Sequence, residues 1–333
     1  MTPVTADWMP PVPLTQLNIV ALAGGVGGAR LVDGLARLVP PEYLTVIVNT
    51  GDDFEHLGLK ICPDLDTVCY TLAGLANPTT GWGRLDETWN ALESLESLGG
   101  PAWFRLGDRD LGLHLERTRR LRAGESLSQV TRHFCRLWGL SLTVLPMSDD
   151  SLPTWVYTEE GELPFQEYFV HRQCQPRVKG FRFDGADRAV PAPGVLQALD
   201  AANVVVICPS NPWVSIDPIL AVPGICEAVA EKFTLAVSPI IGGAAVKGPA
   251  AKMYAEMGIE PSAASVAHHY RPLLSAFVLD QVDANLVEPL GAQGLSVLAT
   301  NTWMKTPDDR QRLAKEVLEF AGKLLEKRSP KRQ

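Results

Sequence analysis

The segment Asn18–Ala29 reads NIVALAGGVGGA, and the rest of the chain is organised around it. Its apolar run, Ile19 to Ala23, is typical of a short buried strand. Four glycines lie within positions 24–28, and an amphipathic helical pattern then runs to Leu38. Glycine has no Cβ, so the backbone can turn sharply and approach a ligand closely. The N-terminus of the following helix suits phosphate, so the segment predicts a strand, a phosphate-binding turn and a helix.

The glycine pattern differs from two known nucleotide-binding motifs. Gly25, Gly27 and Gly28 give G-x-G-G, whereas the dinucleotide fingerprint requires G-x-G-x-x-G. No Gly-Lys-Ser/Thr of a P-loop follows. The alternative is a tight turn between strand and helix that binds nothing. We favour phosphate binding, because four glycines in five residues exceed what a simple turn needs.

Composition and charge bound the class of protein. The chain has 333 residues and a formal net charge of -8, which argues against general nucleic-acid binding. None of the six cysteines forms a C-x-x-C pair, so we expect free thiols in a reducing compartment. The N-terminus lacks the pattern of a signal peptide, and no apolar run reaches membrane-spanning length. We expect a soluble cytoplasmic protein with no membrane partner.

Five predicted strands end in polar or glycine-rich segments. These segments read GGVGG, NTGDD, PMSDD, PSNP and SPIIGG, and they begin near residues 24, 49, 146, 209 and 238. In a parallel α/β sheet, ligands bind beyond the carboxyl ends of the strands. We therefore predict an α/β fold with a doubly wound, mostly parallel, Rossmann-like sheet.

Four acids lie close together in the sequence after the second strand: Asp52, Asp53, Asp64 and Asp66. Clusters of carboxylates suit Mg²⁺, which binds through one or two carboxylates, waters and substrate phosphates. The alternatives are a solvated turn for Asp52 and Asp53, and a cap for a helix over residues 67–73 for Asp64. The pattern predicts that part of the cluster faces a ligand.

The expected organisation has four parts. We predict a loose N-terminal arm over residues 1–15, followed by a discontinuous core with the nucleotide site over residues 16–75 and 141–305. Residues 76–140 form a mainly helical, aromatic-rich insertion that covers a flat ring of the ligand. A C-terminal helix with its tail occupies residues 306–333. Within the insertion, Leu111, Leu115 and Leu121 suggest one apolar helix face.

Several cationic and polar side chains have two interpretations each. Arg105, Asp108 and Arg109 lie beside a glycine and two aromatics, which favours a ligand contact. Arg119 to Arg122 is better explained as a solvated helix face. Lys247 is either a diphosphate contact or a surface lysine.

The motifs together carry a family resemblance. GGVGGAR, VNTGDD, CPDLDTV, WFRLGDRD, LPMSDD, PSNPWVSIDPIL and SPIIGGAAVKGPA occur in this order between about residues 17 and 305. The chain resembles the 2-phospho-L-lactate transferase (CofD) family. The resemblance implies transfer of a phospho-lactyl or phospho-enolpyruvyl group from a guanosine diphosphate-linked donor to the ribityl hydroxyl of a deazaflavin alcohol. GMP is then released, Mg²⁺ is required, and the product belongs to coenzyme F-420 biosynthesis.

The resemblance also implies roles for individual residues. The deazaflavin contacts fall on Asp66 and Arg105. Asp52 and Asp66 are the main candidates for the metal, with Asp53 behind them. Our own hypothesis is that an aspartate of this cluster accepts the proton of the attacking hydroxyl, with Asp66 as the first choice and Asp52 as the second. We expect Gly25, Val26, Gly27 and Gly28 to lie against the diphosphate, and Ser210 and Asn211 to lie near the guanosine.

Two other functions compete with a transferase. A non-enzymatic nucleotide-sugar-binding regulator of the gluconeogenesis-factor group shares the glycine turn and the acidic strand end, but would lack CPDLDTV. A nicotinamide dehydrogenase would need the missing fingerprint glycine. The three-carbon acid of the donor stays open, and the C-terminal helix is a candidate interface for a homodimer.

Overall fold

The computed structural model describes residues 17–328, so the predicted N-terminal arm over residues 1–15 and the end of the tail lie outside the described residues. The fold is built on one parallel sheet with the order β14-β13-β10-β9-β1-β2-β5. The strands are β1 (Ile19–Ala23), β2 (Leu44–Val48), β5 (Thr143–Pro146), β9 (Val204–Ile207), β10 (Phe233–Val237), β13 (Ala276–Asp280) and β14 (Ser296–Thr300).

The strand order reverses between β1 and β9. From β1 the chain moves outward through β2 to β5, then returns to β9 and moves outward in the other direction. Ligands of doubly wound sheets bind at such a switch point, beyond the carboxyl ends of the strands. The predicted doubly wound parallel fold is thus confirmed.

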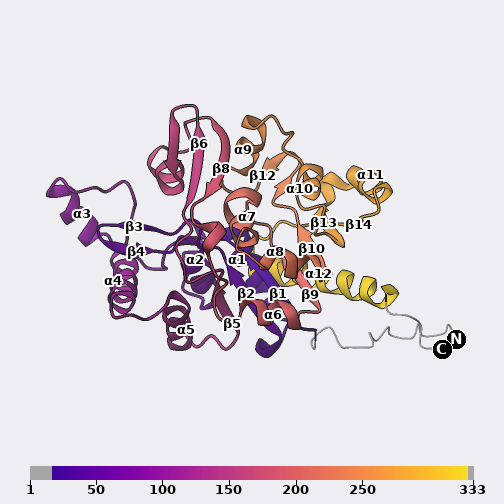
Figure 1. Cartoon of the computed structure of the whole chain (residues 1–333), viewed down its shortest axis with the longest axis horizontal. Helices are drawn as coiled ribbons and strands as arrows, with labels where there is room; N and C mark the ends of the chain where they lie inside the picture. The colour runs from indigo at the N-terminus through magenta and orange to yellow at the C-terminus, as the bar shows by residue number, and fades with distance from the viewer. Residues whose placement is uncertain (1–16, 329–333) are drawn as a thin grey trace.

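Helices cover both faces of the sheet (Figure 1). Alternate residues of β1 point to opposite faces, so Val20 and Leu22 join one apolar cluster while Ile19 and Ala21 join the other. The helices are α1 (Gly25–Ala36), α2 (Pro63–Leu72), α3 (Asn90–Ser97), α4 (Asp108–Arg122), α5 (Leu127–Leu137), α6 (Val195–Ala201), α7 (Asp217–Leu220), α8 (Ile225–Ala230), α9 (Ala250–Glu256), α10 (Ala263–His269), α11 (Val287–Ala292) and α12 (Pro307–Arg328).

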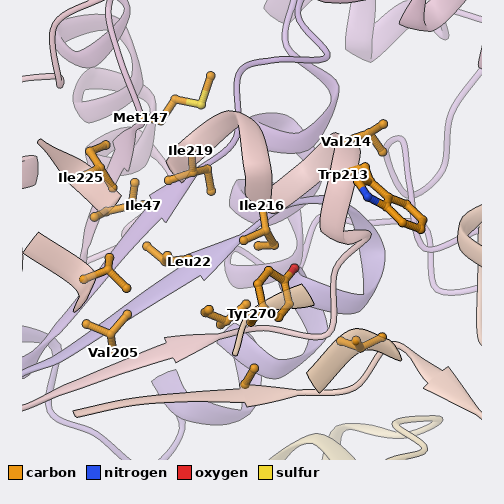
Figure 2. Packing of buried hydrophobic residues seen from close by; sticks show 14 of the residues in the cluster. Leu22, Ile47, Met147, Val205, Trp213, Val214, Ile216, Ile219, Ile225 and Tyr270 are labelled. Carbon is orange, nitrogen blue, oxygen red and sulfur yellow. The ribbon is translucent and has the colours of Figure 1, made fainter. Parts of the chain in front are cut away.

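The two clusters explain why the strands are apolar throughout. Figure 2 shows Leu22, Ile47 and Val205 of neighbouring strands packed against side chains that include Ile216 and Ile225. On the other face, Leu313 and Val317 of α12 pack against α1 and the sheet. The apolar face of α12 is therefore used within the chain, and the homodimer interface stays a prediction.

Three smaller sheets extend the core. A hairpin of β3 (Phe54–His56) and β4 (Leu59–Ile61) follows β2, and the sequence analysis did not predict it. A sheet of β6 (Thr154–Thr158), β7 (Gly161–Pro164) and β8 (Val178–Phe183) lies at the top of Figure 1. A two-stranded ribbon pairs β11 (Ile240–Ile241) with β12 (Ala244–Ala245).

Helices α3, α4 and α5 separate β4 and α2 from β5, and they lie together at the left and lower left of Figure 1. All six cysteines are free thiols, as expected. Within residues 17–328, no helix combines the length and the apolar character needed to cross a bilayer.

Candidate active site

A cavity of about 620 Å³ lies at the carboxyl edge of the sheet, at the switch between β1 and β9. Its wall draws on the glycine turn, α2, the insertion, the segment after β7 and the loops after β9 and β10. The predicted site residues on this wall are Gly25, Val26, Gly27, Asp52, Asp66, Arg105, Ser210 and Asn211.

Close packing accounts for the glycines of the turn. A Cβ on Gly27 would lie 2.2 Å from the carbonyl oxygen of Pro209, and one on Gly28 would lie 2.6 Å from Ser210 Oγ. Gly25 has a φ of +62°, a conformation that other residues rarely adopt. Gly28 is buried in this packing and does not line the cavity.

Ser210 fixes the glycine turn to the loop after β9. Its Oγ donates a hydrogen bond to the Gly24 carbonyl oxygen at 2.8 Å, and the Gly24 N–H lies 3.2 Å from the same Oγ. Asn211 also lines the cavity, and its Oδ1 accepts from the Trp213 N–H at 3.1 Å. The cavity therefore begins where two strand ends are held together.

Asp64 caps the glycine helix rather than its own. The Gly25 N–H at the start of α1 donates to Asp64 Oδ1 at 2.6 Å, and Asn49 Nδ2 donates to Asp64 Oδ2 at 2.9 Å. The predicted cap of a helix over residues 67–73 is wrong, because α2 begins at Pro63 and places Asp64 in its first turn. A third carboxyl thereby joins Asp52 and Asp66 on the cavity wall.

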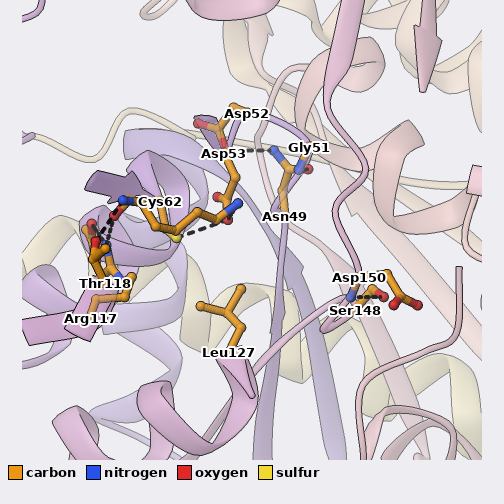
Figure 3. Close-up of polar contacts among 12 residues, drawn as sticks. Asn49, Gly51, Asp52, Asp53, Cys62, Arg117, Thr118, Leu127, Ser148 and Asp150 are labelled. Carbon is orange, nitrogen blue, oxygen red and sulfur yellow. Dashed lines mark hydrogen bonds and ion pairs between the residues drawn. The ribbon is translucent and has the colours of Figure 1, made fainter. Parts of the chain in front are cut away.

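Asp52 is a buried carboxyl with few interactions that would stabilise its negative charge. Its side chain accepts one long hydrogen bond, 3.4 Å from Asn49 Nδ2, and it has no ion pair within the described residues (Figure 3). Burial, followed by the nearby charges of Asp64 and Asp53, raises the pKa of Asp52 well above its usual range. Burial also raises the pKa of Asp64 to about 6. These carboxyls would be stabilised by a cation.

Asp53 and Asp66 already have cationic partners. Asp53 lies 3.1 Å from Lys60 Nζ, accepts from the Cys62 thiol and does not line the cavity. Asp66 accepts hydrogen bonds from both terminal nitrogens of Arg117. Burial raises the pKa of Asp66, and the Arg117 guanidinium opposes that rise.

Arg117 and His114 are site residues that the sequence analysis missed. Arg117 is only 2% exposed, and its Nη1 lies 3.1 Å from His114 Nδ1. Since a guanidinium can only donate, Nδ1 must accept, and we assign the proton of the neutral ring to Nε2. Burial lowers the pKa of His114 well below its usual range, and the ring lies on the cavity wall.

The predicted apolar face of this helix was misplaced. Leu115 is 53% exposed. Leu113, two positions earlier in α4, is buried on the face that also carries Arg117. The spacing of Leu113, Arg117 and Leu121 was the signal that could have found the buried arginine. The solvated face predicted for Arg119 is confirmed, because Arg119 pairs with Glu116 at the surface.

In the charged segment at the start of α4, one predicted residue lines the cavity and two others hold the fold together. Arg105 lines the cavity, with its guanidinium carbon 4.5 Å from the ring centroid of Trp89. The ligand contacts expected of Asp108 and Arg109 are not found on the cavity wall. Asp108 instead accepts from the backbone of α3, and Arg109 donates to the Leu85 carbonyl.

Aromatic rings also line the cavity. Phe165 and Phe169 stack with centroids 5.4 Å apart and planes 4° apart, and Trp103 and Phe104 of the insertion also line the cavity. Flat apolar walls with a few polar groups suit a planar ring system.

The acids after β5 belong to the scaffold. Asp149 accepts from the backbone N–H and hydroxyl of Ser128 in α5, and Asp150 accepts from the Val190 N–H. Figure 3 shows the hydrogen bond from the Asp150 N–H to Ser148 Oγ, which lies away from Asp52. Neither Asp149 nor Asp150 lines the cavity, so this strand end does not supply the carboxylates expected of it.

Within residues 17–328 no group of three or more His, Cys, Asp or Glu is arranged to hold a metal unaided. A cation would therefore need ligand oxygens or water besides the carboxylates. The fold and the cavity define a Rossmann-like protein whose cavity at the switch point joins a glycine turn, buried carboxyls and aromatic rings.

The chain belongs to the family described as 2-phospho-L-lactate transferase CofD, whose model matches residues 19–315. It is therefore a member of a transferase family. It is 48% identical to a phosphoenolpyruvate transferase of Streptomyces griseus, over 92% of this chain and 98% of that protein. It is 37% identical to a 2-phospho-L-lactate transferase of Methanococcoides burtonii, over 90% of this chain and 98% of that protein.

The fold is shared more widely than the sequence. A crystal structure of a UPF0052-family protein from Bacillus halodurans matches with a TM-score of 0.60 and 17% identity. The match covers 91% of this chain and 100% of that one. At this identity the likeness concerns the fold alone.

Proposed function

We propose that this chain moves a phospho-enolpyruvyl or phospho-lactyl group from a guanosine diphosphate-linked donor to the ribityl hydroxyl of 7,8-didemethyl-8-hydroxy-5-deazariboflavin, releasing GMP. The product is an intermediate of coenzyme F-420 biosynthesis. The observation that carries the proposal is one cavity that joins a glycine turn, buried carboxyls and a flat aromatic wall. Family membership favours this transferase over the regulator and dehydrogenase alternatives.

The two substrates would occupy different parts of the cavity. The donor's diphosphate would lie at Gly25, Val26 and Gly27, with its guanosine near Ser210 and Asn211. The deazaflavin would lie against the aromatic wall, near Asp66 and Arg105. Gly28 would act through packing, because it lies behind the turn.

Phosphoryl transfer needs positioning and charge neutralisation more than a protein nucleophile. The ribityl oxygen forms a bond to the phosphorus that carries the three-carbon acid, the bond from that phosphorus to the GMP oxygen breaks, and the hydroxyl proton must leave. We propose Asp66 as the proton acceptor, because Arg117 fixes its carboxylate and favours the ionised form. Asp52 is the second candidate.

Asp52 is also our leading candidate for a Mg²⁺ ligand. It is buried, lines the cavity and lacks an ion pair, and oxygen donors suit this ion. Asp66 is the other predicted ligand, but Arg117 engages both of its oxygens, so Asp64 is better placed to join Asp52. The ion would supply positive charge against the donor's diphosphate when bound.

We propose the enolpyruvyl donor as the preferred one. The relatives named phosphoenolpyruvate transferase are 40–48% identical to this chain, and two named 2-phospho-L-lactate transferase are 37% and 41% identical. A cytoplasmic location and a homodimer are further proposals.

The test is GMP release by the purified protein with Mg²⁺, the deazaflavin alcohol and each donor in turn. We expect release that requires the deazaflavin and stops when a chelator removes the metal. Tight nucleotide binding without turnover of either donor would contradict the proposal and favour the regulator.

A further inference from the structure

Arg30 and Lys247 line the cavity and have no carboxylate partner within the described residues, and the same is true of Arg105, which lies over the Trp89 ring. Arg30 follows the glycine turn by one helical turn of α1, and Lys247 lies on the loop between β12 and α9. Within the described residues neither forms an ion pair. The contacts they make are to backbone carbonyls: Arg30 Nη1 donates to Met304 O at 3.1 Å, and Lys247 Nζ donates to Thr80 O.

The two charged ends lie beside each other. A Cβ on Gly81 would be 3.3 Å from Lys247 Nζ and 3.6 Å from Arg30 Nη2, so both groups flank one point beside Gly81, and both residues line the cavity. The same point lies 2.8 Å from a methyl group of Val26 in the glycine turn. The cations are thus next to the residues proposed to meet the donor's diphosphate.

This arrangement is unfavourable without a ligand. Arg30 is half-buried, and burial lowers the pKa of both groups, with Arg30 lowering that of Lys247 further. Two like charges that are partly withdrawn from water repel each other and lose hydration. An anion between them would offset both the repulsion and the lost hydration. Guanidinium and ammonium groups are the usual protein partners of phosphate and carboxylate oxygens.

We infer that Arg30 and Lys247 form a subsite for an oxyanion of the donor, either its terminal phosphate or the carboxylate of its three-carbon acid. The identity of the donor rests on the proposed function. The binding of an anionic nucleotide does not, so the two can fail separately.

The experiment measures equilibrium binding of GDP and GMP to the wild type, Arg30→Gln, Lys247→Gln and the double variant, at one ionic strength. We expect GDP affinity to fall about tenfold for each single variant and more for the double variant, as for the loss of charge-assisted hydrogen bonds. Arg119→Gln, which removes an exposed cation paired with Glu116, should bind GDP like the wild type.

The pattern of losses identifies the oxyanion. A larger loss for GDP than for GMP assigns the subsite to the terminal phosphate. Unchanged binding of both nucleotides, with the KM of the complete donor raised about tenfold, assigns it to the carboxylate. Unchanged nucleotide binding together with an unchanged donor KM would overturn the inference.

Folding is controlled in two ways. Arg30→Lys keeps the charge and should keep most of the affinity, and Lys247 is exposed, so its replacement by Gln leaves no buried space and keeps a donor for the Thr80 carbonyl. Reduced GDP binding in a protein that turns over neither donor would sustain the subsite while refuting the proposed reaction.

Discussion

Asp52 is buried beside two other carboxyls, and its pKa is raised by burial and by their charges. Its ionised form is therefore costly in the folded protein. Replacing it with Asn keeps the shape and removes the repulsion. We predict that Asp52→Asn increases the free energy of unfolding at pH 7.5, without divalent cations, by about 1 kcal/mol.

The same substitution should lower turnover more than about 100-fold, because it removes a charge at the reacting centre. Urea unfolding and GMP release measure the two effects. A variant that is less stable than the wild type but fully active would contradict both the electrostatics and the role of Asp52.

Replacing Asp66 should change the stability in the opposite direction. Asp66→Asn leaves Arg117 buried without a full counter-charge, so we expect a loss of about 3 kcal/mol in stability together with loss of turnover. Turnover is measured well below the unfolding temperature of the variant, so that folding does not explain the result. Full activity in the folded variant would refute Asp66 as proton acceptor and leave Asp52 as the candidate.

Asp64 gives a pH dependence of stability. Its pKa of about 6 in the folded protein lies above the usual aspartate pKa of 3.8, so the folded state binds more protons between these values. The contribution of Asp64 to stability is then present below about pH 4 and falls as the pH rises to about 6.

We predict that the difference in unfolding free energy between Asp64→Asn and the wild type changes over this pH window in favour of the variant. Denaturant unfolding from pH 4 to 7, with a chelator present, measures it. A difference that does not vary with pH would show that the carboxyl titrates normally in the fold.

At this scale the sequence predicted part of the site. Asp52, Asp66 and Arg105 were found because they stand in recognisable motifs. Arg117 was missed because a buried arginine looks like a polar surface residue until its partner is known. The alternative role considered for Asp64 was wrong, because a first-turn carboxyl ordinarily caps its own helix, whereas this one accepts a hydrogen bond from another helix across the fold.

Among the elements, the strand–turn–helix unit at the start of α1 depends on Gly27. Because a Cβ there would meet a backbone carbonyl at 2.2 Å, the loop after β9 would have to move. We predict that Gly27→Ala lowers the free energy of unfolding by about 1–3 kcal/mol and weakens GDP binding.

Gly112→Ala is the matched control. Gly112 lies within α4 and has nothing within 4 Å of its Cβ position, so alanine should stabilise the helix by about 0.5–1 kcal/mol. Equal effects of the two substitutions in thermal or urea unfolding would contradict the packing explanation of the turn.

The sequence predicted regular elements better than the irregular ones. The predicted C-terminal helix is present as α12, which begins at Pro307 with Thr306 Oγ1 accepting from the Asp309 N–H, and a tight turn at residues 159–160 joins β6 to β7. These features depend on local chemistry. The hairpin of β3 and β4 was missed, since each strand has only three residues and its pairing is decided by packing.

For the whole molecule, the site exists only after distant segments are brought together. Arg30, Trp103, Phe165 and Lys247 line one cavity although more than 200 positions separate the first from the last. Strand order at the switch point made the carboxyl edge predictable. The contribution of the segment after β7 was not predictable, because no local pattern says which loop closes over another.

The central claim concerns a single reaction, so the most direct measurement is the mass of its product. The protein is mixed with Mg²⁺, the deazaflavin alcohol and equal amounts of the enolpyruvyl and lactyl donors, and the deazaflavin products are separated and weighed by mass spectrometry. The account predicts a phosphodiester-linked deazaflavin formed in step with GMP, mainly the enolpyruvyl product, which has two hydrogens fewer than the lactyl one. Unmodified deazaflavin after prolonged incubation, with nucleotide still tightly bound, would contradict it.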